Sequence, residues 1–589
     1  MVTTYYTGMD SKFFHTDILN DEPLSKLSWI LIIATIIYQL LYVWQGLDFT
    51  DTGFHLTAYQ QIFDNPYTVH YSFMFWLSNI FGGAIMKFFP GLLANRIASV
   101  LLHTAMFWLY YDLVRRITGR NKAIIYCSLS LLFFQYYGFE TLNYDSFSIA
   151  SMSLVVYFFV RGLWSNTIWQ FALGAFICGA ATYFRVTNLA AVSFIPLAGI
   201  WLYLLDKDIA KTVKTTLLMT TSYIGGHAII IALMMVMAHW DLFLSNIDFV
   251  GNMGTAGDSS HGFLPVMLLY AKGWVKIGLF VSMLVMIYYL RGLTRSFIST
   301  ELLQGLSLFA LGFALFFIYQ YPTATWSKLR YLLYASTLIS TVFLLWKGDN
   351  KMSILASMAF VMVVIFPLGS DSGIEKLYFS CGLSLALLFY VIDKLWEEEQ
   401  FATFKQMGAV LYITTCLCFG FTNTYFDLGS RLQKTATTSH PALSHIYTTA
   451  ERAATIDSLL IELNKHVSKG DYLLAFSDIP MINYLTETKP CIGTSWPKLY
   501  YAPSIFETEL NHGYNKSQPS AVVMQKMEMR SAWPTNDTPD YLDLSMTKGG
   551  IHPENRLPEH YAIMLQFLEG KYDLVWESST FRVYVPITK

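Results

Sequence analysis

The sequence predicts an α-helical polytopic membrane protein with a soluble α/β domain at its C-terminal end. Of the 589 residues, 54% are hydrophobic and only 14% are charged, whereas soluble domains contain about 25% charged residues. Apolar runs of about 17–25 residues, the length that crosses a bilayer as a helix, recur as far as residue 423, after which the composition becomes polar. The formal net charge of −2 gives no reason to expect a nucleic-acid partner.

These apolar runs predict about thirteen transmembrane helices. The first run, Ser28–Trp44, follows a segment that lacks the basic start and small-residue cleavage site of a signal peptide, so we expect it to be retained as a helix. The other runs centre on residues 93–114, 123–138, 147–163, 168–183, 187–205, 215–238, 276–290, 302–320, 331–346, 352–367, 377–392 and 406–423. The expected regions are an N-terminal segment over 1–27, a transmembrane domain over 28–427 with its first outer loop over 46–92, and a soluble domain over 428–589.

The loops between the runs predict the orientation in the membrane. With thirteen spans, four loops rich in Lys and Arg fall on one side, which the positive-inside rule makes cytoplasmic. Their basic residues are Arg115, Arg116, Arg120, Lys122, Lys207, Lys211, Lys214, Arg291, Arg295, Lys347 and Lys351. We therefore expect a cytoplasmic N-terminus and an extracytoplasmic C-terminal domain.

The polar C-terminal region has local patterns typical of α/β structure. Tyr472–Phe476 predicts a strand, and Asp478–Pro480 after it predicts the start of a short helix. Tyr572–Glu577 and Phe581–Val585 predict a terminal hairpin. These elements predict a domain of about 160 residues, within the usual size range for one domain.

Two carboxylates, Asp48 and Asp51, follow the first span directly. Charge beside a membrane helix is costly and usually functional. Asp51 is the stronger candidate, because Gly53 permits a tight backbone path beside it and a carboxylate held there can deprotonate a hydroxyl or an amine. The alternative is that both carboxylates are solvated or cap a helix that starts near Phe54.

Further polar candidates fall on the same outer face. Asp145 is expected to assist Asp51, to orient a substrate, or to cap the helix that follows it. Arg185, Lys328 and Arg330 are cations on a face where positive charge is otherwise scarce. Such cations predict an anionic partner, and the guanidinium group suits a phosphate. The alternative for Arg185 is that its side chain reaches the lipid headgroups.

Four short motifs follow one another along the membrane region. Asp51–His55 reads DTGFH, Ala94–Arg96 reads ANR, Gly174–Arg185 contains a G…GAA…R pattern, and Leu329–Tyr331 reads LRY. As an ordered set on one membrane face, they resemble the motifs of the GT-C superfamily of polyprenyl-phosphate-sugar-dependent glycosyltransferases. The protein O-mannosyltransferases and the bacterial aminoarabinose transferases belong to that group.

The resemblance covers roughly Ser28–Trp346 and implies an inverting glycosyltransferase that works on the outer face. It implies that Asp51 takes the proton of the acceptor, while Arg185, Lys328 or Arg330 stabilises the departing polyprenyl phosphate. The side chains that it implies for contact with the sugar or the prenyl chain are Phe54, His55, Tyr59 and Trp326.

The partners implied by the resemblance are a polyprenyl-phosphate-linked sugar donor, a glycan, lipid or protein acceptor, and the lipids of a bacterial inner membrane. No cofactor is firmly implied and no metal-binding residue is predicted. Relatives with monophosphate carriers generally work without a metal and the sequence has no clear ligand set, but a divalent cation stays open. Thr52 stands where the family has a second acidic residue, which leaves the sugar and the acceptor undetermined.

Three other interpretations are open. The first is an oligosaccharide ligase or oligosaccharyltransferase of the same fold, which the sequence barely separates from a single-sugar transferase. The second is a lipid-linked sugar transporter or flippase, and the third is a non-catalytic membrane assembly protein. Transporters usually carry ionisable groups at mid-membrane, whereas the spans here are nearly free of charge apart from His227. That distribution favours catalysis at the membrane surface.

Overall fold

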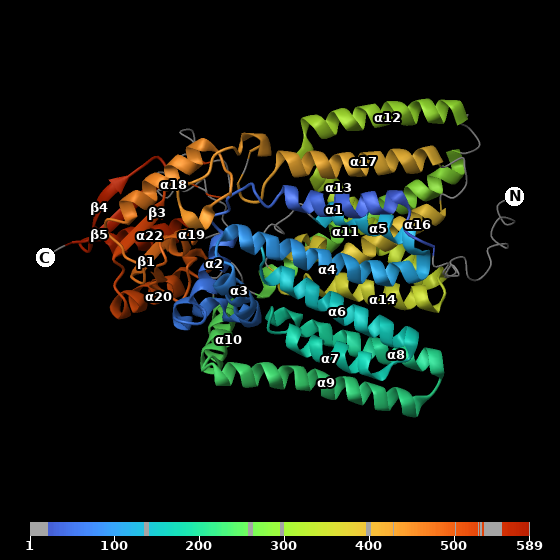
Figure 1. Cartoon of the computed structure of the whole chain (residues 1–589), viewed down its shortest axis with the longest axis horizontal. Coiled ribbons are helices and arrows are strands. Elements are labelled where there is room, and N and C mark those ends of the chain that lie inside the picture. Colours follow the sequence, from blue (N-terminus) through green and yellow to red (C-terminus); the bar gives the residue numbers. More distant parts are fainter. Residues whose placement is uncertain are drawn as a thin grey trace.

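The computed structural model describes residues 22–134, 141–256, 263–294, 300–370, 372–395, 402–427, 429–500, 502–527, 529, 533–534 and 557–587. Long helices lie side by side, and a small sheet with its own helices sits at one end of them (Figure 1). Helix α1 begins at the opposite end of this bundle (Figure 1). The protein is therefore mostly helical, with a mixed α/β part at one end.

Each predicted apolar run coincides with a helix or with a bent pair of helices. The helices of the bundle are α1 (Lys26–Leu41), α4 (Leu92–Thr118), α5 (Arg120–Phe134), α6 (Tyr144–Ser165), α7 (Ile168–Ala181), α8 (Phe194–Asp206), α9 (Ile209–Val236), α11 (Phe263–Thr294), α12 (Thr300–Gln320), α13 (Pro322–Lys347), α14 (Asn350–Ile365), α15 (Leu377–Ser380), α16 (Gly382–Leu395) and α17 (Ala402–Thr422). Shorter elements connect them: α2 (Asp51–Gln61), η1 (Pro66–Phe75), α3 (Trp76–Phe88), η2 (Val186–Ser193), α10 (Trp240–Thr255) and η3 (Gly373–Lys376).

Six helical spans among the described residues are long and apolar enough to cross a membrane. They are Leu92–Thr118, Tyr144–Ser165, Val186–Asp206, Ile209–Val236, Leu264–Met286 and Ala324–Lys347. A seventh is the pair Gly373–Ser380 and Gly382–Leu395, bent by 68°. Other apolar helices, such as α1 and α7, are shorter than 18 residues. These helices make the chain an integral membrane protein, with six or seven spans by length and composition.

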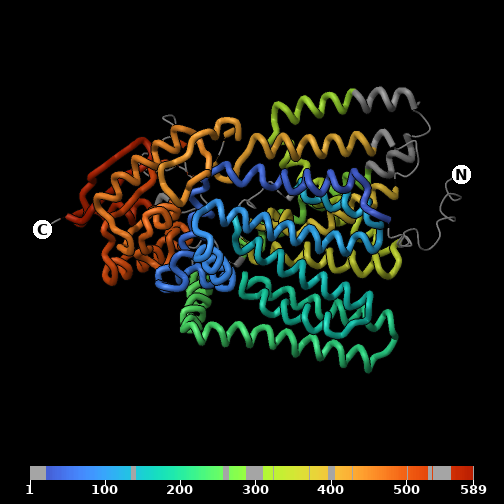
Figure 2. Tube along the Cα trace, viewed as in Figure 1, coloured from blue at the N-terminus to red at the C-terminus, as the bar shows by residue number. Residues whose placement is uncertain are grey.

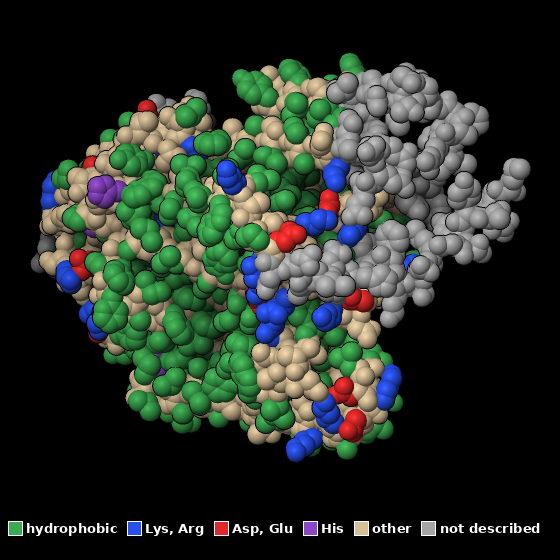
Figure 3. Space-filling view, turned by 45° about the vertical axis from the view of Figure 1, so that its right-hand side comes forward, with side chains coloured by type: hydrophobic (Ala, Val, Ile, Leu, Met, Phe, Trp, Pro, Cys, Tyr) green, Lys and Arg blue, Asp and Glu red, His purple; other side chains and the backbone are tan. Residues whose placement is uncertain are grey.

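The turns at the end away from the sheet are set by short polar signals. Gly119, at φ +83°, ends α4, and Lys207 in the left-handed region ends α8. Asp208 then caps α9 by accepting a hydrogen bond from the amide of Lys211 at 2.9 Å. Lys and Arg side chains gather toward this end, whereas the flanks of the bundle are largely apolar (Figure 3).

The C-terminal part contains one five-stranded sheet in the order β2-β1-β3-β5-β4. The strands are β1 (Tyr472–Phe476), β2 (Lys489–Pro490), β3 (Ala521–Gln525), β4 (Tyr572–Glu577) and β5 (Phe581–Pro586). Strand β1 pairs in parallel with β2 and β3, whereas β5 pairs antiparallel with β3 and β4. The strand over Tyr472–Phe476 and the terminal hairpin predicted from the sequence are confirmed.

Both faces of the sheet are covered. The helices around it are α18 (Ala450–Leu463), α19 (Met481–Leu485), α20 (Pro503–Lys516) and α22 (Leu557–Leu568). Alternate side chains of β1 point to opposite faces: Leu473 belongs to one buried cluster with residues of α18, and Phe476 to another with residues of α20 and α22. This explains why the strand is a continuous apolar run with no polar alternation.

The C-terminal part packs directly on α2, although hundreds of residues separate them in the sequence (Figure 2). The amide of Met481 donates to the carbonyl of Phe49 at 3.1 Å, and the hydroxyl of Thr57 donates to the carbonyl of Pro480 at 3.1 Å. A Cβ atom at Gly53 would lie 2.2 Å from the backbone nitrogen of Met481. Gly53 is therefore required for the close approach of α2 and α19.

Replacing Gly53 with Ala should destabilise the protein. The added methyl group meets backbone that cannot rotate away, and overpacking of this kind costs about 1–3 kcal/mol. The matched control is Gly225→Ala in α9, where no atom lies within 4 Å of the new methyl group; that change should be neutral or stabilise by up to about 1 kcal/mol. Thermal unfolding in detergent measures both. Equal melting temperatures for the two variants would contradict this packing.

Candidate functional site

A small pocket opens at the end of the bundle that faces the sheet. Its lining residues are Asp48, Asp51, Thr52, His55, Arg96, Thr141, Asn143 and Tyr425. They come from the α1–α2 loop, from α2, from the second turn of α4, from the segment before α6 and from the segment after α17. The pocket thus joins the predicted first outer loop to three distant parts of the chain.

Asp51 is the first residue of α2 and lies half-buried in this pocket. The hydroxyl of Tyr425 donates a hydrogen bond to Oδ2 of Asp51. Burial, followed by the charge of Asp51, raises the pKa of Tyr425 well above its ordinary value, so the phenol stays protonated and acts as a donor. An ionisable carboxylate is therefore oriented in the pocket by a neutral hydroxyl group.

Asp48 has a different role from Asp51. Its carboxylate is 2% exposed and accepts hydrogen bonds from the amide (2.8 Å) and hydroxyl (2.7 Å) of Thr50 and from the amide of Thr52 (2.7 Å). It thereby caps the start of α2. Burial, and then the nearby charge of Asp51, raises the pKa of Asp48 to about 6. Of the two alternatives, helix capping describes Asp48, and α2 begins at Asp51 and not near Phe54.

Arg96 supplies positive charge beside the two carboxylates. Its guanidinium is 1% exposed and donates to the carbonyls of Val43 (2.9 Å), Gln45 (3.2 Å) and Gly46 (2.7 Å). It therefore fixes the path of the chain from α1 into the loop while it lines the pocket. Arg96 belongs to the ANR motif, but no local sequence signal indicates that it lines the pocket.

His55 lies one turn after Asp51, so both side chains point to the same face of α2. Its ring lies against Tyr144, with centroids 5.2 Å apart, and Tyr59, at 6.1 Å. Burial, together with the charge of Lys376, lowers the pKa of His55 to about 3. The imidazole is neutral at physiological pH and presents a polar ring to the pocket.

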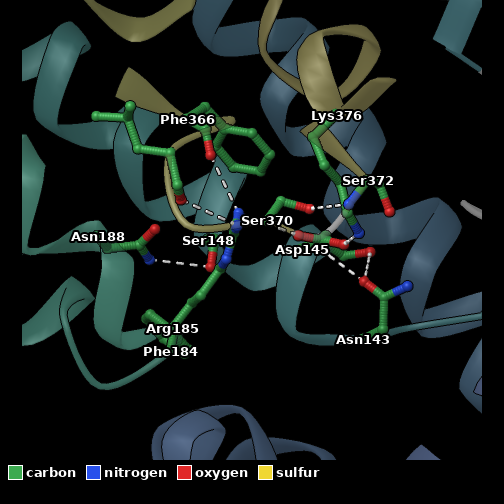
Figure 4. Close-up of polar contacts among 12 residues, drawn as sticks. Asn143, Asp145, Ser148, Phe184, Arg185, Asn188, Phe366, Ser370, Ser372 and Lys376 are labelled. Carbon is green, nitrogen blue, oxygen red and sulfur yellow. Dashed lines mark hydrogen bonds and ion pairs between the residues drawn. The ribbon is translucent and has the colours of Figure 1, made fainter. Parts of the chain in front are cut away.

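A buried ionic cluster adjoins the pocket (Figure 4). The carboxylate of Asp145, 2% exposed, pairs with the ammonium of Lys376 and lies 3.6 Å from Nη1 of Arg185. The guanidinium of Arg185 also donates to the carbonyls of Phe366 (3.1 Å) and Leu368 (3.3 Å). Arg185 is therefore held inside the protein and does not reach the lipid headgroups.

The helix cap next to this cluster is Asn143, not Asp145. The side-chain oxygen of Asn143 accepts from the amide of Ser146 at 2.9 Å, and α6 begins at Tyr144. The ring of Tyr144 lies under the ammonium of Lys376, with Nζ 5.4 Å from the ring centroid. Because the same ring contacts His55, it connects the ionic cluster with the pocket.

Arg330 extends the cluster along η3. Its guanidinium pairs with Glu375, the neighbour of Lys376, and the hydroxyl of Tyr331 donates to Glu375 at 2.7 Å. Lys328 is exposed and has no ion pair or hydrogen bond within the described part of the chain. In the cluster that the described residues form, three cations (Arg185, Arg330 and Lys376) accompany two carboxylates (Asp145 and Glu375). The local charge favours an anion.

Three residues with predicted sugar or prenyl contacts lie in packed surroundings outside the pocket lining. Phe54 is buried between Tyr71 and Trp496, and Trp326 stacks on Phe419. Tyr59 is buried and its hydroxyl donates to the carbonyl of Leu142 at 3.0 Å. In the described part of the chain, no group of three or more His, Cys, Asp or Glu side chains could hold a metal ion.

No protein-family model and no curated protein matches this sequence. The chain is similar to the crystal structure of ArnT from Cupriavidus metallidurans bound to undecaprenyl phosphate, with 12% identity over 95% of this chain and 98% of that one and a TM-score of 0.41. It is also similar to the structure of the archaeal oligosaccharyltransferase AglB from Archaeoglobus fulgidus in complex with an inhibitory peptide and a dolichol-phosphate. The identity is 12%, the match covers 85% of this chain and 69% of that one, and the TM-score is 0.43.

A third similar structure is the arabinosyltransferase EmbB from Mycobacterium smegmatis, with 12% identity over 72% of this chain and 43% of that one and a TM-score of 0.36. These neighbours are GT-C glycosyltransferases, the superfamily that the sequence motifs resemble. Because the TM-scores lie below 0.5, the likeness carries no argument about activity, which has to rest on the residues of this chain.

The raised pKa of Asp48 predicts a pH dependence of stability. A carboxyl group with a pKa near 3.8 in the unfolded chain and about 6 in the folded protein favours folding when protonated. That contribution is complete below about pH 4 and is lost as the pH rises through 6. The melting temperature of the wild type should therefore fall relative to that of Asp48→Asn between pH 4 and 6. Parallel pH profiles of the two proteins would show that Asp48 titrates normally.

Proposed function

We propose that this chain is an inverting glycosyltransferase that moves a sugar from a polyprenyl-phosphate carrier to an acceptor hydroxyl or amine at the outer face of the membrane. The observation that supports it most is the contiguity of two chemically different sites. The pocket of Asp51 provides a base, and the cluster of Arg185 and Lys376 provides positive charge. Tyr144 lies between them.

The surroundings of Asp51 support its proposed role as the base. Asp51 lines an open pocket, and one of its carboxylate oxygens is already held by Tyr425. An acceptor hydroxyl bound in the pocket would give its proton to Asp51 as the acceptor oxygen attacks the anomeric carbon. Because the imidazole of His55 is neutral, it suits a hydrogen bond with a sugar hydroxyl and not the binding of an anion.

The leaving group of the reaction explains why the proposal needs the cations of the ionic cluster. Breaking the glycosyl–phosphate bond leaves negative charge on the polyprenyl phosphate, which preorganised cations stabilise as it develops. Arg185 and Lys376 are held in place by Asp145 and by backbone carbonyls before any substrate binds. With the base and the cations on different sides of a bound sugar, attack and departure occur on opposite faces, which inverts the anomeric configuration.

The membrane arrangement in this proposal has thirteen spans, including short helices such as α1, α7 and α14. Turns rich in Lys and Arg, such as those from α4 to α5 and from α8 to α9, lie at the end away from the sheet (Figure 1). The positive-inside rule then makes that end cytoplasmic and the pocket extracytoplasmic. Residues 428–589 form the proposed extracytoplasmic domain, in a bacterial inner membrane. The acceptor is a glycan, a lipid or a protein.

Replacing Asp51 with Asn should abolish transfer but preserve donor binding. The carboxamide is nearly isosteric but cannot accept a proton, and general-base catalysis typically contributes about 10²–10⁴-fold to the rate. The assay supplies purified protein in lipid with radiolabelled polyprenyl-phosphate sugars and scores both donor binding and sugar release or transfer. The matched control is Asp64→Asn, an exposed carboxylate in the same loop. Full activity of Asp51→Asn would exclude Asp51 as the base.

Replacing Lys376 with Gln should weaken the binding of undecaprenyl phosphate by at least about tenfold, because a charge-assisted hydrogen bond contributes about 1.5–3 kcal/mol. Lys376→Arg keeps the charge and should retain much of the affinity. Lys465→Gln, at an exposed position just after the end of α18, is the control for surface charge. Equilibrium binding of radiolabelled lipid to purified protein measures all three variants. Unchanged affinity of Lys376→Gln would remove Lys376 from the phosphate site.

A further inference from the structure

The α1–α2 loop, which carries Asp48 and leads into Asp51, is held by the C-terminal part of the chain on both sides. On one side, the amide of Tyr447 donates to the carbonyl of Trp44 at 2.7 Å, and the amide of Gly46 donates to the carbonyl of Tyr447 at 2.9 Å. On the other side, the amide of Met481 donates to the carbonyl of Phe49 at 3.1 Å. The loop therefore depends on partners about 400 residues away in the sequence.

Asp427 anchors the middle of the loop. Its fully buried carboxylate accepts a hydrogen bond from the amide of Leu47 at 2.7 Å and another from the hydroxyl of Thr448 at 3.0 Å. It also pairs with Arg452 of α18 and lies 3.4 Å from Nζ of Lys434, and both cations are buried. Asp427 thus links the loop to the helical layer of the C-terminal part.

Tyr425 lies two residues before this anchor, in the pocket itself. Its hydroxyl donates to Oδ2 of Asp51, and the two residues are 374 positions apart. Since Asp427 fixes the segment that carries Tyr425 as well as the loop that leads into Asp51, it sets the position of the donor relative to the carboxylate. Asp427 therefore positions both Tyr425 and the loop before Asp51.

We infer that the segment Tyr425–Asp427 is a positioning element for the catalytic base, with Tyr425 orienting the carboxylate of Asp51 and Asp427 holding the α1–α2 loop in register with it. This inference rests on the proposed function, because it concerns the same pocket. It also gives the C-terminal part of the chain a role in transfer, because Lys434 and Arg452 hold Asp427 in place.

The test of Tyr425 is the variant Tyr425→Phe in the full chain, assayed for transfer. We expect kcat to fall about tenfold while KM for the donor stays unchanged, because the lost hydroxyl donates to the base. The acidic limb of the pH–rate profile should move to higher pH, since a hydrogen bond to a carboxylate favours its charged form. The other titratable and charged groups around this contact are Asp48, His55, Arg96 and Tyr378, and the variant leaves all of them in place.

The matched control is Tyr447→Phe, which removes a hydroxyl from the same region but keeps the backbone hydrogen bonds of Tyr447 to the loop. It should keep the wild-type kcat and pH profile. An unchanged kcat and pH profile in Tyr425→Phe, in a preparation where Asp51→Asn is inactive, would overturn the inference and leave the proposed function intact. A wild type that transfers no sugar from any donor in the panel would count against the proposed function, and the inference would fall with it.

The anchoring role of Asp427 has a separate test that needs no turnover. In Asp427→Asn, hydrogen exchange at the amides of residues 46–50 should become at least tenfold faster, because the amide of Leu47 loses a charged acceptor. Exchange in the strands β1 and β3 should stay at the wild-type rate, which shows that the C-terminal part is still folded. Unchanged exchange in residues 46–50 would overturn this role, whatever the activity of the variant.

Discussion

The buried carboxylate of Asp427 is the interaction on which the site depends most. It joins Leu47 to Arg452 and Lys434. Leu47 and Asp427 are 380 positions apart in the sequence. Breaking a buried ion pair by removing one partner costs about 3–5 kcal/mol, because the remaining charge has no compensation. The anchor is therefore costly to disturb, and it fixes a loop that would otherwise be a flexible connection between a membrane helix and α2.

The site combines two electrostatic environments that need to be kept apart. The pocket holds Asp48 and Asp51 close together. Burial, and then the repulsion between the two carboxylates, raises the pKa of Asp48. The neighbouring cluster has excess positive charge around Arg185 and Lys376. If the cations were in direct contact with Asp51, they would neutralise it and block a phosphate at the same time. In the observed arrangement Asp145 pairs with Lys376 and lies near Arg185, whereas Asp51 accepts a hydrogen bond from the hydroxyl of Tyr425.

The sequence predicted the helices well because hydropathy is a local property. Within the described residues, each apolar run coincides with a helix or a bent pair of helices, and the strand at Tyr472–Phe476 was found from its apolar β-type pattern. The position of Asp51 beside the first span also pointed to the pocket, and Arg185 was identified as a cation that needs an anionic partner. Helix starts were less accurate. Capping by Asp48 was one of the expected alternatives, but α2 begins at Asp51 and not near Phe54, and the cap of α6 is Asn143 and not Asp145. The roles of Tyr425 and Asp427 in the site could not be predicted, because Asp51 and Leu47, their partners there, lie more than 370 residues away and neither residue has a local motif.

The most direct measurement is an experimental structure of the protein with bound undecaprenyl phosphate. This lipid is what remains of the proposed donor after its sugar has been transferred. We expect the phosphate to lie within hydrogen-bond distance of Lys376 or Arg185, with the pocket of Asp51 beside it on the sheet side of the bundle. A phosphate bound elsewhere, for example at the exposed Lys328 with the ionic cluster unchanged, would contradict the assignment of a single composite site for glycosyl transfer.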